Sequence, residues 1–369
     1  MSCPSQAEKQ PTPEPRLALQ GLTPEALVER VPGVLLADAR RVVALVNRGA
    51  DFRAPDSNLR RTARLAVEAV GHVPELRVVE TVQSDFDGFL KLVLETGDQR
   101  LIETVRIPLE RPGRFSVCVS SQVGCAIGCT FCATGRLGLS RNLEPWEIVE
   151  QVRRVRATLD PARGERVHGV VFQGMGEPLA NLDRVIEAAR VLSDPNGLAI
   201  DARKITVSTV GLAPGIRRLA RELPRVRLAW SIGSALSGAR RRLMPIDRSH
   251  PLDEAYAAVV EHARETGLAP LWALTLLAGV NDSEADALAL AALARRFGTD
   301  TGRLPRISII PYNRIAGDAD DPFRRTSAEV EGRFRDAMRD AGVFTHKRYS
   351  GGSDVAAACG QLAASASAS

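Results

Sequence analysis

The sequence predicts an α/β fold built on a parallel β-sheet, either open or curled into a partial (β/α) barrel. The main observation is an alternation of short apolar runs with amphipathic, helix-like segments from about residue 145 to residue 349. Such alternation is typical of parallel sheets, in which a helix connects successive strands. A further strand is predicted to end near Cys118. With that strand included, a partial barrel explains the pattern at least as well as a doubly wound sheet.

Six apolar runs in this region are predicted strands, and helix-like segments lie between most of them. The predicted strands are GVVFQ (169–173), KITVST (204–209), RLAWSI (227–232), LWALTLL (271–277), RISIIP (306–311) and FTHKRY (344–349). The predicted helices are 181–193, 213–222, 252–267, 283–297 and 326–341.

The chain before the barrel predicts a small accessory region. Residues 21 to about 75 are expected to be helical, with Thr23 as an N-cap and Pro24 at the first helical position. Between residues 77 and 120, four β-rich runs are separated by Asp-Gly, Gly-Asp and Pro-Gly turn signals, which predict a meander. We therefore expect four parts: a disordered tail (1–20), a helical and β accessory domain that is a candidate RNA-binding region (21–100), the core (101–350) and a C-terminal segment with a disordered end (351–369).

Composition gives weaker information. The 369 residues contain no apolar run long enough to span a bilayer, and the polar, Pro-rich N-terminus lacks a signal-peptide core. We therefore expect a cytoplasmic protein with reduced thiols. The net charge of +5 is equally compatible with an anionic partner and with an ordinary solvated surface.

Half of the six cysteines fall in one short stretch, GCAIGCTFCATG (124–135). Structural zinc sites take four ligands, but Cys125, Cys129 and Cys132 have no second cysteine pair nearby, and the five histidines are scattered. Three thiolates without a fourth ligand instead suit a [4Fe–4S] cluster with one open iron, which can chelate a substrate and pass it an electron. Zinc and unmetallated thiols remain as alternatives.

This spacing, after a strand and at the start of a βα series, resembles the radical S-adenosylmethionine (SAM) superfamily, and it implies a partial barrel of that type. Such a site must also hold the cofactor's ammonium group, and GMGEP (174–178) supplies the carboxylate of Glu177 just past a strand. Several runs together resemble one family, the RlmN/Cfr group of RNA adenine methyltransferases. These runs are CVSSQVGCAIGCTFCATG, SRNLEPWEIVEQV, GMGEPLAN, ITVSTVGLAPGIRRLA, LMPI, GVNDSE, IPYN and DVAAACGQL.

The family resemblance implies a ping-pong radical mechanism. A first SAM methylates the cysteine that matches Cys359, and a second is cleaved to a radical that removes hydrogen from this methyl group. The resulting carbon adds to adenine, and the cysteine that matches Cys118 then releases the product by forming a disulfide. Glu103 matches the family's proposed proton acceptor. The cofactor contacts implied by the match are Gly176, Glu177, Ser208, Ser231 and Asn313.

Three positions depart from the family pattern: Gly233 replaces a usual histidine, Ala273 a glutamate and Gln173 a common methionine. The resemblance implies ribosomal or transfer RNA, or both, as substrate, modified at carbon 2 or carbon 8. It also implies one [4Fe–4S] cluster, SAM and an electron donor such as flavodoxin or ferredoxin. We expect a monomer with no membrane partner. The alternatives are a radical SAM enzyme that acts on a non-RNA substrate and a zinc protein that binds RNA without catalysis.

Overall fold

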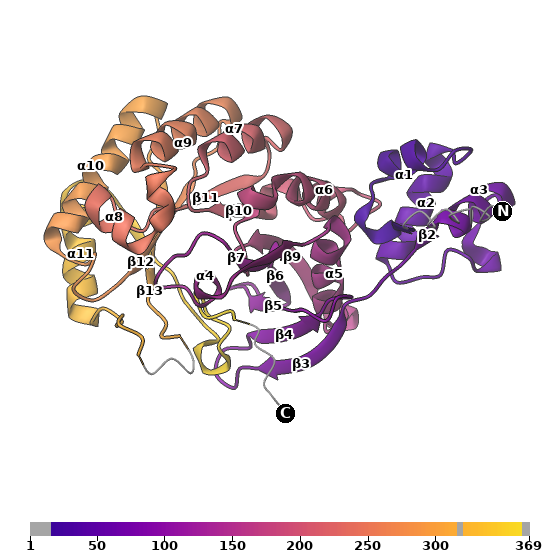
Figure 1. Cartoon of the computed structure of the whole chain (residues 1–369), viewed down its shortest axis with the longest axis horizontal. Helices are drawn as coiled ribbons and strands as arrows, with labels where there is room; N and C mark the ends of the chain where they lie inside the picture. Colours follow the sequence, from indigo (N-terminus) through magenta and orange to yellow (C-terminus); the bar gives the residue numbers. More distant parts are fainter. Residues whose placement is uncertain (1–15, 316–319, 364–369) are drawn as a thin grey trace, which may run out of the picture.

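The computed structural model describes residues 16–315 and 320–363, and a ten-stranded mixed sheet lies at its centre (Figure 1). Across the sheet the strand order is β14-β13-β12-β11-β10-β9-β6-β5-β4-β3. From β6 to β14 neighbouring strands are parallel, whereas β3, β4, β5 and β6 pair in antiparallel fashion. Cys3 and most of the two predicted disordered ends lie outside the described residues.

The parallel half of the sheet, with its helices, forms the predicted partial (β/α) barrel. Its strands are β6 (Arg114–Val119), β9 (Arg166–Phe172), β10 (Ile205–Thr209), β11 (Arg227–Ser231), β12 (Leu271–Leu276), β13 (Arg306–Pro311) and β14 (Thr345–Lys347). Its main helices are α5 (Pro145–Arg156), α6 (Leu182–Ser193), α7 (Ala213–Glu222), α9 (Leu252–Thr266), α10 (Glu284–Thr301) and α11 (Ala328–Asp340), with a short α8 (Ser237–Leu243). The strand order follows the chain order without the reversal of a doubly wound sheet, so the barrel interpretation is confirmed.

Aromatic packing between sheet and helices holds the barrel together. Trp230 on β11 and Trp272 on β12 are fully buried, and their rings meet edge to face at 5.2 Å. Phe297 on α10 packs against Trp272 at 5.4 Å. Each such pair contributes about 0.5–1.5 kcal/mol beyond the burial of its area. This packing joins β11, β12 and α10 into one body, and ligands in βα barrels bind at the carboxyl ends of such strands.

The predicted meander extends the same sheet. It consists of β3 (Arg77–Gln83), β4 (Leu90–Glu95) and β5 (Leu101–Pro108), followed by β6. Asp-Gly at 87–88 and Gly-Asp at 97–98 lie between successive strands, as the turn signals predict. Residues on both sides of position 100, including Leu92 and Ile102, share one hydrophobic core with the barrel. The meander strands before residue 100 are therefore continuous with the barrel rather than with the N-terminal helices.

The N-terminal helices form a separate apolar cluster beside the barrel (Figure 1). They are α1 (Pro24–Arg30), α2 (Leu36–Asn47) and α3 (Arg61–Val70), and Thr23 caps α1 by accepting a hydrogen bond from the Ala26 N–H at 3.3 Å. The cluster docks on α5 through Gly21, because a Cβ there would lie 2.8 Å from the backbone nitrogen of Trp146. None of the helices in the described part of the chain could cross a membrane on grounds of length and hydropathy.

Part of the predicted disordered tail is ordered. Residues 17–18 form β1, which pairs in parallel with β2 (Gly71–His72), and a 3-10 turn follows at Leu19–Gly21. Leu19 and Gln20 are buried. The expectation of disorder through residue 20 was therefore wrong for this stretch, because Leu17 and Leu19 pack onto the N-terminal apolar cluster.

Candidate active site

The cysteine loop follows β6 and folds as a short hairpin around a single helical turn. Its strands are β7 (Gln122–Cys125) and β8 (Gly138–Asn142), with α4 (Ala133–Leu137) between them. Gly124 has a φ of +78°, and a Cβ there would overlap the carbonyl oxygen of Gly138, so only glycine fits. The loop brings Cys125, Cys129 and Cys132 into one apolar cluster, with the first two buried and the third half-buried.

The chemistry of these three thiols fits an iron–sulfur cluster. Burial is the main cause that raises the pKa of Cys125 to about 12 and that of Cys129 well above its ordinary value, with smaller contributions from Glu177 and the neighbouring thiols. Thiolates at such positions are costly unless a cationic metal centre offsets their charge. No three His, Cys, Asp or Glu side chains among the described residues converge on a point that could hold a single ion. A four-iron cluster does not require such convergence, because each thiolate binds a different iron.

Glu177 lies just past the end of β9, where the turn Pro178–Asn181 begins. Its carboxylate accepts hydrogen bonds from two backbone N–H groups: Oε1 from Leu179 at 3.0 Å and Oε2 from Val210 at 3.0 Å. The side chain is buried, and this burial raises its pKa to about 7 against the opposing effect of these hydrogen bonds. Among the described residues, no cationic side chain shifts the pKa of Glu177. A buried carboxylate in this situation is suited to bind an ammonium group.

Around this carboxylate lies a cleft of about 100 Å³, here called the Glu177 cleft, at the carboxyl ends of β9, β10 and β11. Gly176, Glu177, Ser208 and Ser231 all line it, and the two serine hydroxyls lie 3.4 Å apart. Gly176 has a φ of +102°, and a Cβ there would come within 2.6 Å of the Gln122 side chain. The glycine therefore lets this turn pack closely against β7. Four of the five predicted cofactor contacts meet here.

The fifth predicted contact, Asn313, does not line the Glu177 cleft. It lies just after β13, and its Nδ2 donates to the Ser350 Oγ at 2.8 Å and to the Cys359 carbonyl at 3.3 Å. Asn313 is buried, and it connects the barrel to the last described part of the chain, here called the C-terminal segment (residues 348–363).

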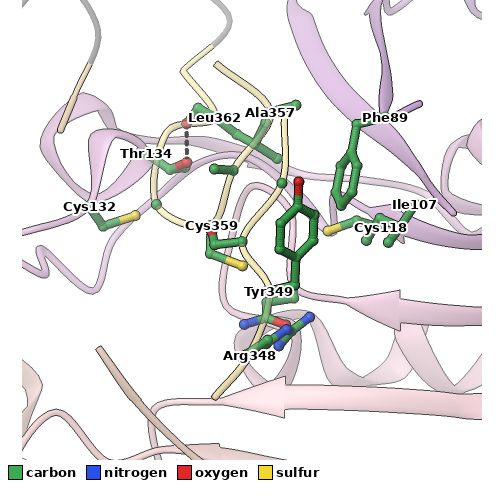
Figure 2. Close-up of a pocket in the computed structure, with 16 residues that line it drawn as sticks. Phe89, Ile107, Cys118, Cys132, Thr134, Arg348, Tyr349, Ala357, Cys359 and Leu362 are labelled. Atoms are coloured by element: carbon green, nitrogen blue, oxygen red, sulfur yellow. Dashed lines mark hydrogen bonds between the residues drawn. The ribbon is translucent and has the colours of Figure 1, made fainter. Parts of the chain in front are cut away.

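A second cavity, here called the thiol cavity, has a volume of about 100 Å³ and contains the two cysteines outside the loop that belong to the described residues (Figure 2). Cys118 on β6, Cys132 of the loop and Cys359 of the C-terminal segment all line it. In Figure 2 Cys359 lies between the other two. Burial, together with the nearby Cys359 thiol, raises the pKa of Cys118 to about 12. The two cysteines are 241 positions apart in the sequence, so the fold alone brings them together.

The C-terminal segment closes the thiol cavity, and hydrogen bonds attach it to three parts of the molecule. At the cysteine loop, Ala133 donates its N–H to the Gly360 carbonyl at 2.9 Å, and Thr134 donates to the Leu362 carbonyl. After β13, the Arg314 carbonyl accepts from the Gln361 side chain at 2.8 Å. At the β3–β4 turn, Asp87 accepts hydrogen bonds from the Tyr349 hydroxyl at 2.8 Å and the Gly352 N–H at 2.9 Å.

Glu103 lines neither cavity. It lies on β5, buried, with its Oε1 3.0 Å from the Lys91 ammonium. Burial raises its pKa, while Lys91 and the backbone N–H of Ala363 oppose this effect. Among the described residues, none gives Oε2 a hydrogen bond of ordinary geometry, although the backbone of Ala363 lies close enough to lower the pKa of Glu103. Glu103 is thus near the end of the C-terminal segment, not among the groups that face Cys118 and Cys359.

The departures from the family pattern have local explanations in two cases. Gly233 has a φ of +68°, and a Cβ there would overlap the sulfur of Met244, so a histidine at this position would require the Met244 side chain to shift. Gln173 accepts a hydrogen bond from Arg348 at 3.1 Å. Nothing in the structure explains the alanine at position 273. Sequence reasoning did not predict Arg348, Tyr349 and Asp87 as site residues. Arg348 and Tyr349 belong to no recognised motif, and Asp87 indicated only a turn.

Known proteins resemble this chain over most of its length. The sequence profile of the Radical SAM superfamily matches residues 119–292. A probable RNA methyltransferase of Sorangium cellulosum is 55% identical over 350 residues, which cover 90% of this chain and 88% of that protein. The dual-specificity RNA methyltransferase RlmN of Syntrophobacter fumaroxidans is 42% identical over 312 residues, which cover 84% and 86%. The crystal structure of a radical SAM methyltransferase from Sphaerobacter thermophilus has a TM-score of 0.81 and 39% identity, and the match covers 94% of this chain and 99% of that one.

Proposed function

This chain belongs to the RlmN family of radical SAM methyltransferases, and from that membership we propose that it methylates an adenine ring carbon in RNA. The methyl donor is S-adenosylmethionine, the acceptor is carbon 2 or carbon 8, and the substrate is ribosomal RNA, transfer RNA or both. The family uses one [4Fe–4S] cluster together with SAM. When bound, these groups supply the methyl group and the reductive cleavage that makes its carbon reactive.

The observation that carries this proposal is the meeting of Cys118 and Cys359 in one cavity with Cys132. A radical SAM enzyme needs only the three loop cysteines for its cluster. An adenine ring carbon is electrophilic, so direct attack on the SAM methyl group is unavailable to it. A pair of additional thiols beside the cluster loop provides one group to carry a methyl group and another to release it.

Each site residue named above has a proposed role in this reaction. Thiolates of the loop cysteines anchor the cluster, and the Glu177 carboxylate binds the ammonium group of SAM. The hydroxyls of Ser208 and Ser231 and the backbone of Gly176, which line the same cleft, accommodate the rest of the cofactor. Asn313 acts through its hydrogen bonds to the C-terminal segment, which hold Cys359 in place. Glu103 would accept the proton lost from adenine, and its distance from the thiol cavity requires the RNA to approach β5.

We also infer the surroundings of the reaction. The cluster must be reduced for each cleavage, so a small electron-transfer protein such as flavodoxin or ferredoxin is the proposed donor. The disulfide left after product release must be reduced by a thiol, which suits the cytoplasm. The Glu177 cleft and the thiol cavity are both lined within one chain, so a monomer suffices for the proposed reaction.

The test is an anaerobic reaction of reconstituted protein with total RNA, a reductant and SAM labelled in its methyl group. Nucleoside mass spectrometry then identifies the product, with Cys359→Ala treated in parallel. Labelled methyladenosine from the wild type alone supports the proposal and identifies the carbon. SAM cleavage without any labelled nucleoside would instead mean that the enzyme acts on a substrate other than RNA.

A further inference from the structure

The thiol cavity contains one cationic side chain among its lining residues, Arg348. Its guanidinium donates a hydrogen bond from Nη1 to the Gln173 side-chain oxygen at 3.1 Å. The backbone of Arg348 is also fixed, since its N–H donates to the Ile309 carbonyl at 2.9 Å. Arg348 is therefore held at both ends, with its charge inside a cavity that contains Cys118 and Cys359 (Figure 2).

Gln173 contacts both Cys118, through its backbone, and Arg348, through its side chain. It directly follows β9, which pairs in parallel with β6, and Val171 is opposite Cys118 in that pairing. The backbone N–H of Gln173 lies within reach of the Cys118 sulfur and favours its ionised form, while its side chain orients Arg348. One residue thus places a partial positive charge and a full positive charge around the same thiol.

We propose that Arg348, oriented by Gln173, is a positioning residue that stabilises the thiolate of Cys118 for the step that releases methylated RNA. This inference rests on the proposed function and deepens it. Cys118 is otherwise placed unfavourably for ionisation, because it is buried on a strand. A guanidinium lowers the pKa of Cys118 against this effect of burial.

The step itself requires a thiolate. Cys118 attacks the Cys359 sulfur, so an S–S bond forms and the bond from that sulfur to the methylene carbon breaks. The electron pair of the broken bond passes to the carbon, which takes up a proton and becomes the methyl group on adenine. The two sulfurs are oxidised to a disulfide, and a dithiol reductant returns them to thiols. Attack by a thiol is far slower than attack by a thiolate.

Other titratable groups around Cys118 do not supply this cation. Cys132, Tyr349 and Cys359 are the further titratable groups that line the cavity. On the neighbouring strands β4 and β5, Lys91 is paired with Glu103. Neither of these two lines the cavity. Among the described residues that line the cavity, Arg348 is the one with a guanidinium or ammonium group.

The first test measures the alkylation rate of Cys118 as a function of pH, by peptide mass spectrometry on the reconstituted holoprotein in a Cys359→Ala background. Arg348→Met removes the positive charge, and Arg348→Lys keeps it. Gln173→Met removes the hydrogen bond that orients the Arg348 side chain. Loss of the charge raises the Cys118 pKa, so the profile moves to higher pH. A rise of one pKa unit lowers the thiolate fraction about tenfold, and the gain in nucleophilicity reduces the net loss in rate to about three- to fourfold. Arg333→Met, an exposed arginine on α11, is the control.

The expected order of midpoints is wild type and Arg348→Lys lowest, Gln173→Met intermediate and Arg348→Met highest. Identical profiles for wild type and Arg348→Met would overturn the proposal. This assay needs neither RNA nor turnover, so it remains informative even if the proposed RNA methylation fails.

The second test follows one turnover with RNA and separates the covalent enzyme–RNA adduct from free methylated RNA on a denaturing gel. Arg348→Met should form the adduct and release it several-fold more slowly, with release partly restored at higher pH. A merely structural role would instead reduce adduct formation and leave release, once the adduct exists, unchanged with pH. That result would contradict the proposal. Absence of adduct and product in the wild type would count against the proposed function, not against the Cys118–Arg348 relation measured by alkylation.

Discussion

The Glu177 cleft and the thiol cavity share the wall residues Gln173 and Gly174, yet they are assembled from different parts of the chain. The cleft is made by the ends of three successive barrel strands and is shaped by backbone: two N–H groups hold Glu177, and Gly176 packs against Gln122 where no side chain would fit. The thiol cavity is completed by the C-terminal segment, which side-chain and loop hydrogen bonds attach to the barrel. Binding of SAM should therefore depend on the barrel alone, whereas methyl transfer should depend on both parts.

The largest expected effect separates the two regions completely. Cys125→Ala removes one of three anchors of the cluster, so both SAM cleavage and RNA methylation should be lost. Cys359→Ala should abolish RNA methylation but leave the cluster and SAM cleavage intact. Iron content, visible absorbance and 5′-deoxyadenosine release measure the first property, and labelled nucleosides measure the second. Loss of the cluster in Cys359→Ala would show that the two regions are not independent.

A second variant should stop the reaction after RNA has become attached to the protein and before the methylated product is released. Cys118→Ala leaves the methyl carrier in place but removes the thiol that releases the product, so RNA should remain covalently attached after one turnover. The adduct should appear as a shifted protein band that ribonuclease treatment removes. Cys359→Ala is the matched control, and it should give no such band. Free methylated RNA from Cys118→Ala in normal yield would rule out the role assigned to Cys118.

An intermediate effect is expected within the Glu177 cleft. Glu177→Gln keeps the size of the side chain and an acceptor oxygen but removes the charge that pairs with the ammonium of SAM. A hydrogen bond to a charged group contributes about 1.5–3 kcal/mol, so the Kd for SAM should rise about tenfold to a hundredfold. Equilibrium binding to the cluster-loaded protein measures this. The alkylation rates of Cys118 and Cys359 should not change; a change in both would mean that the variant has disturbed the fold.

The smallest expected effect concerns the attachment of the C-terminal segment. Asp87→Ala removes the acceptor for Tyr349 and Gly352, and the loss of about 1 kcal/mol from the closed arrangement should slow RNA methylation about fivefold. SAM cleavage without RNA should be unchanged, because the barrel alone forms the cleft. Asp85→Ala, in the same turn and exposed, is the control. An equal decrease in SAM cleavage would show that the segment also supports the Glu177 cleft.

The difference between the two regions also explains what the sequence could predict. The barrel strands and helices follow from local alternation of apolar and amphipathic segments, and the three loop cysteines from their spacing. Gly176, Glu177, Ser208 and Ser231 meet because each follows or ends a predicted parallel strand, which brings them to one edge. These are consequences of local pattern and a repeated topology.

The thiol cavity has no such local signal. Cys118 and Cys359 were paired only through the family resemblance, because nothing in their own surroundings links them. The contact of Gln173 with Arg348 spans 175 positions and that of Asp87 with Gly352 spans 265, so only the folded chain shows them. The buried stretch at Leu19 and Gln20 was missed for a related reason: its apolar partners lie tens of residues away in α2 and α3.

The wall shared by the two cavities has a consequence for how the methyl carbon travels. At Gly174 the backbone presses against β6 so closely that a Cβ would lie 2.8 Å from the Ser120 nitrogen and the Val119 carbonyl. Gly174 therefore packs directly on β6, and together with Gln173 it lines both cavities. Because the two cavities share these residues, the methyl carbon would pass from SAM in the Glu177 cleft to Cys359 in the adjacent thiol cavity without entering bulk solvent. A side chain added at position 174 would have to push this shared wall away from β6, and it should therefore hinder methyl transfer between the two cavities.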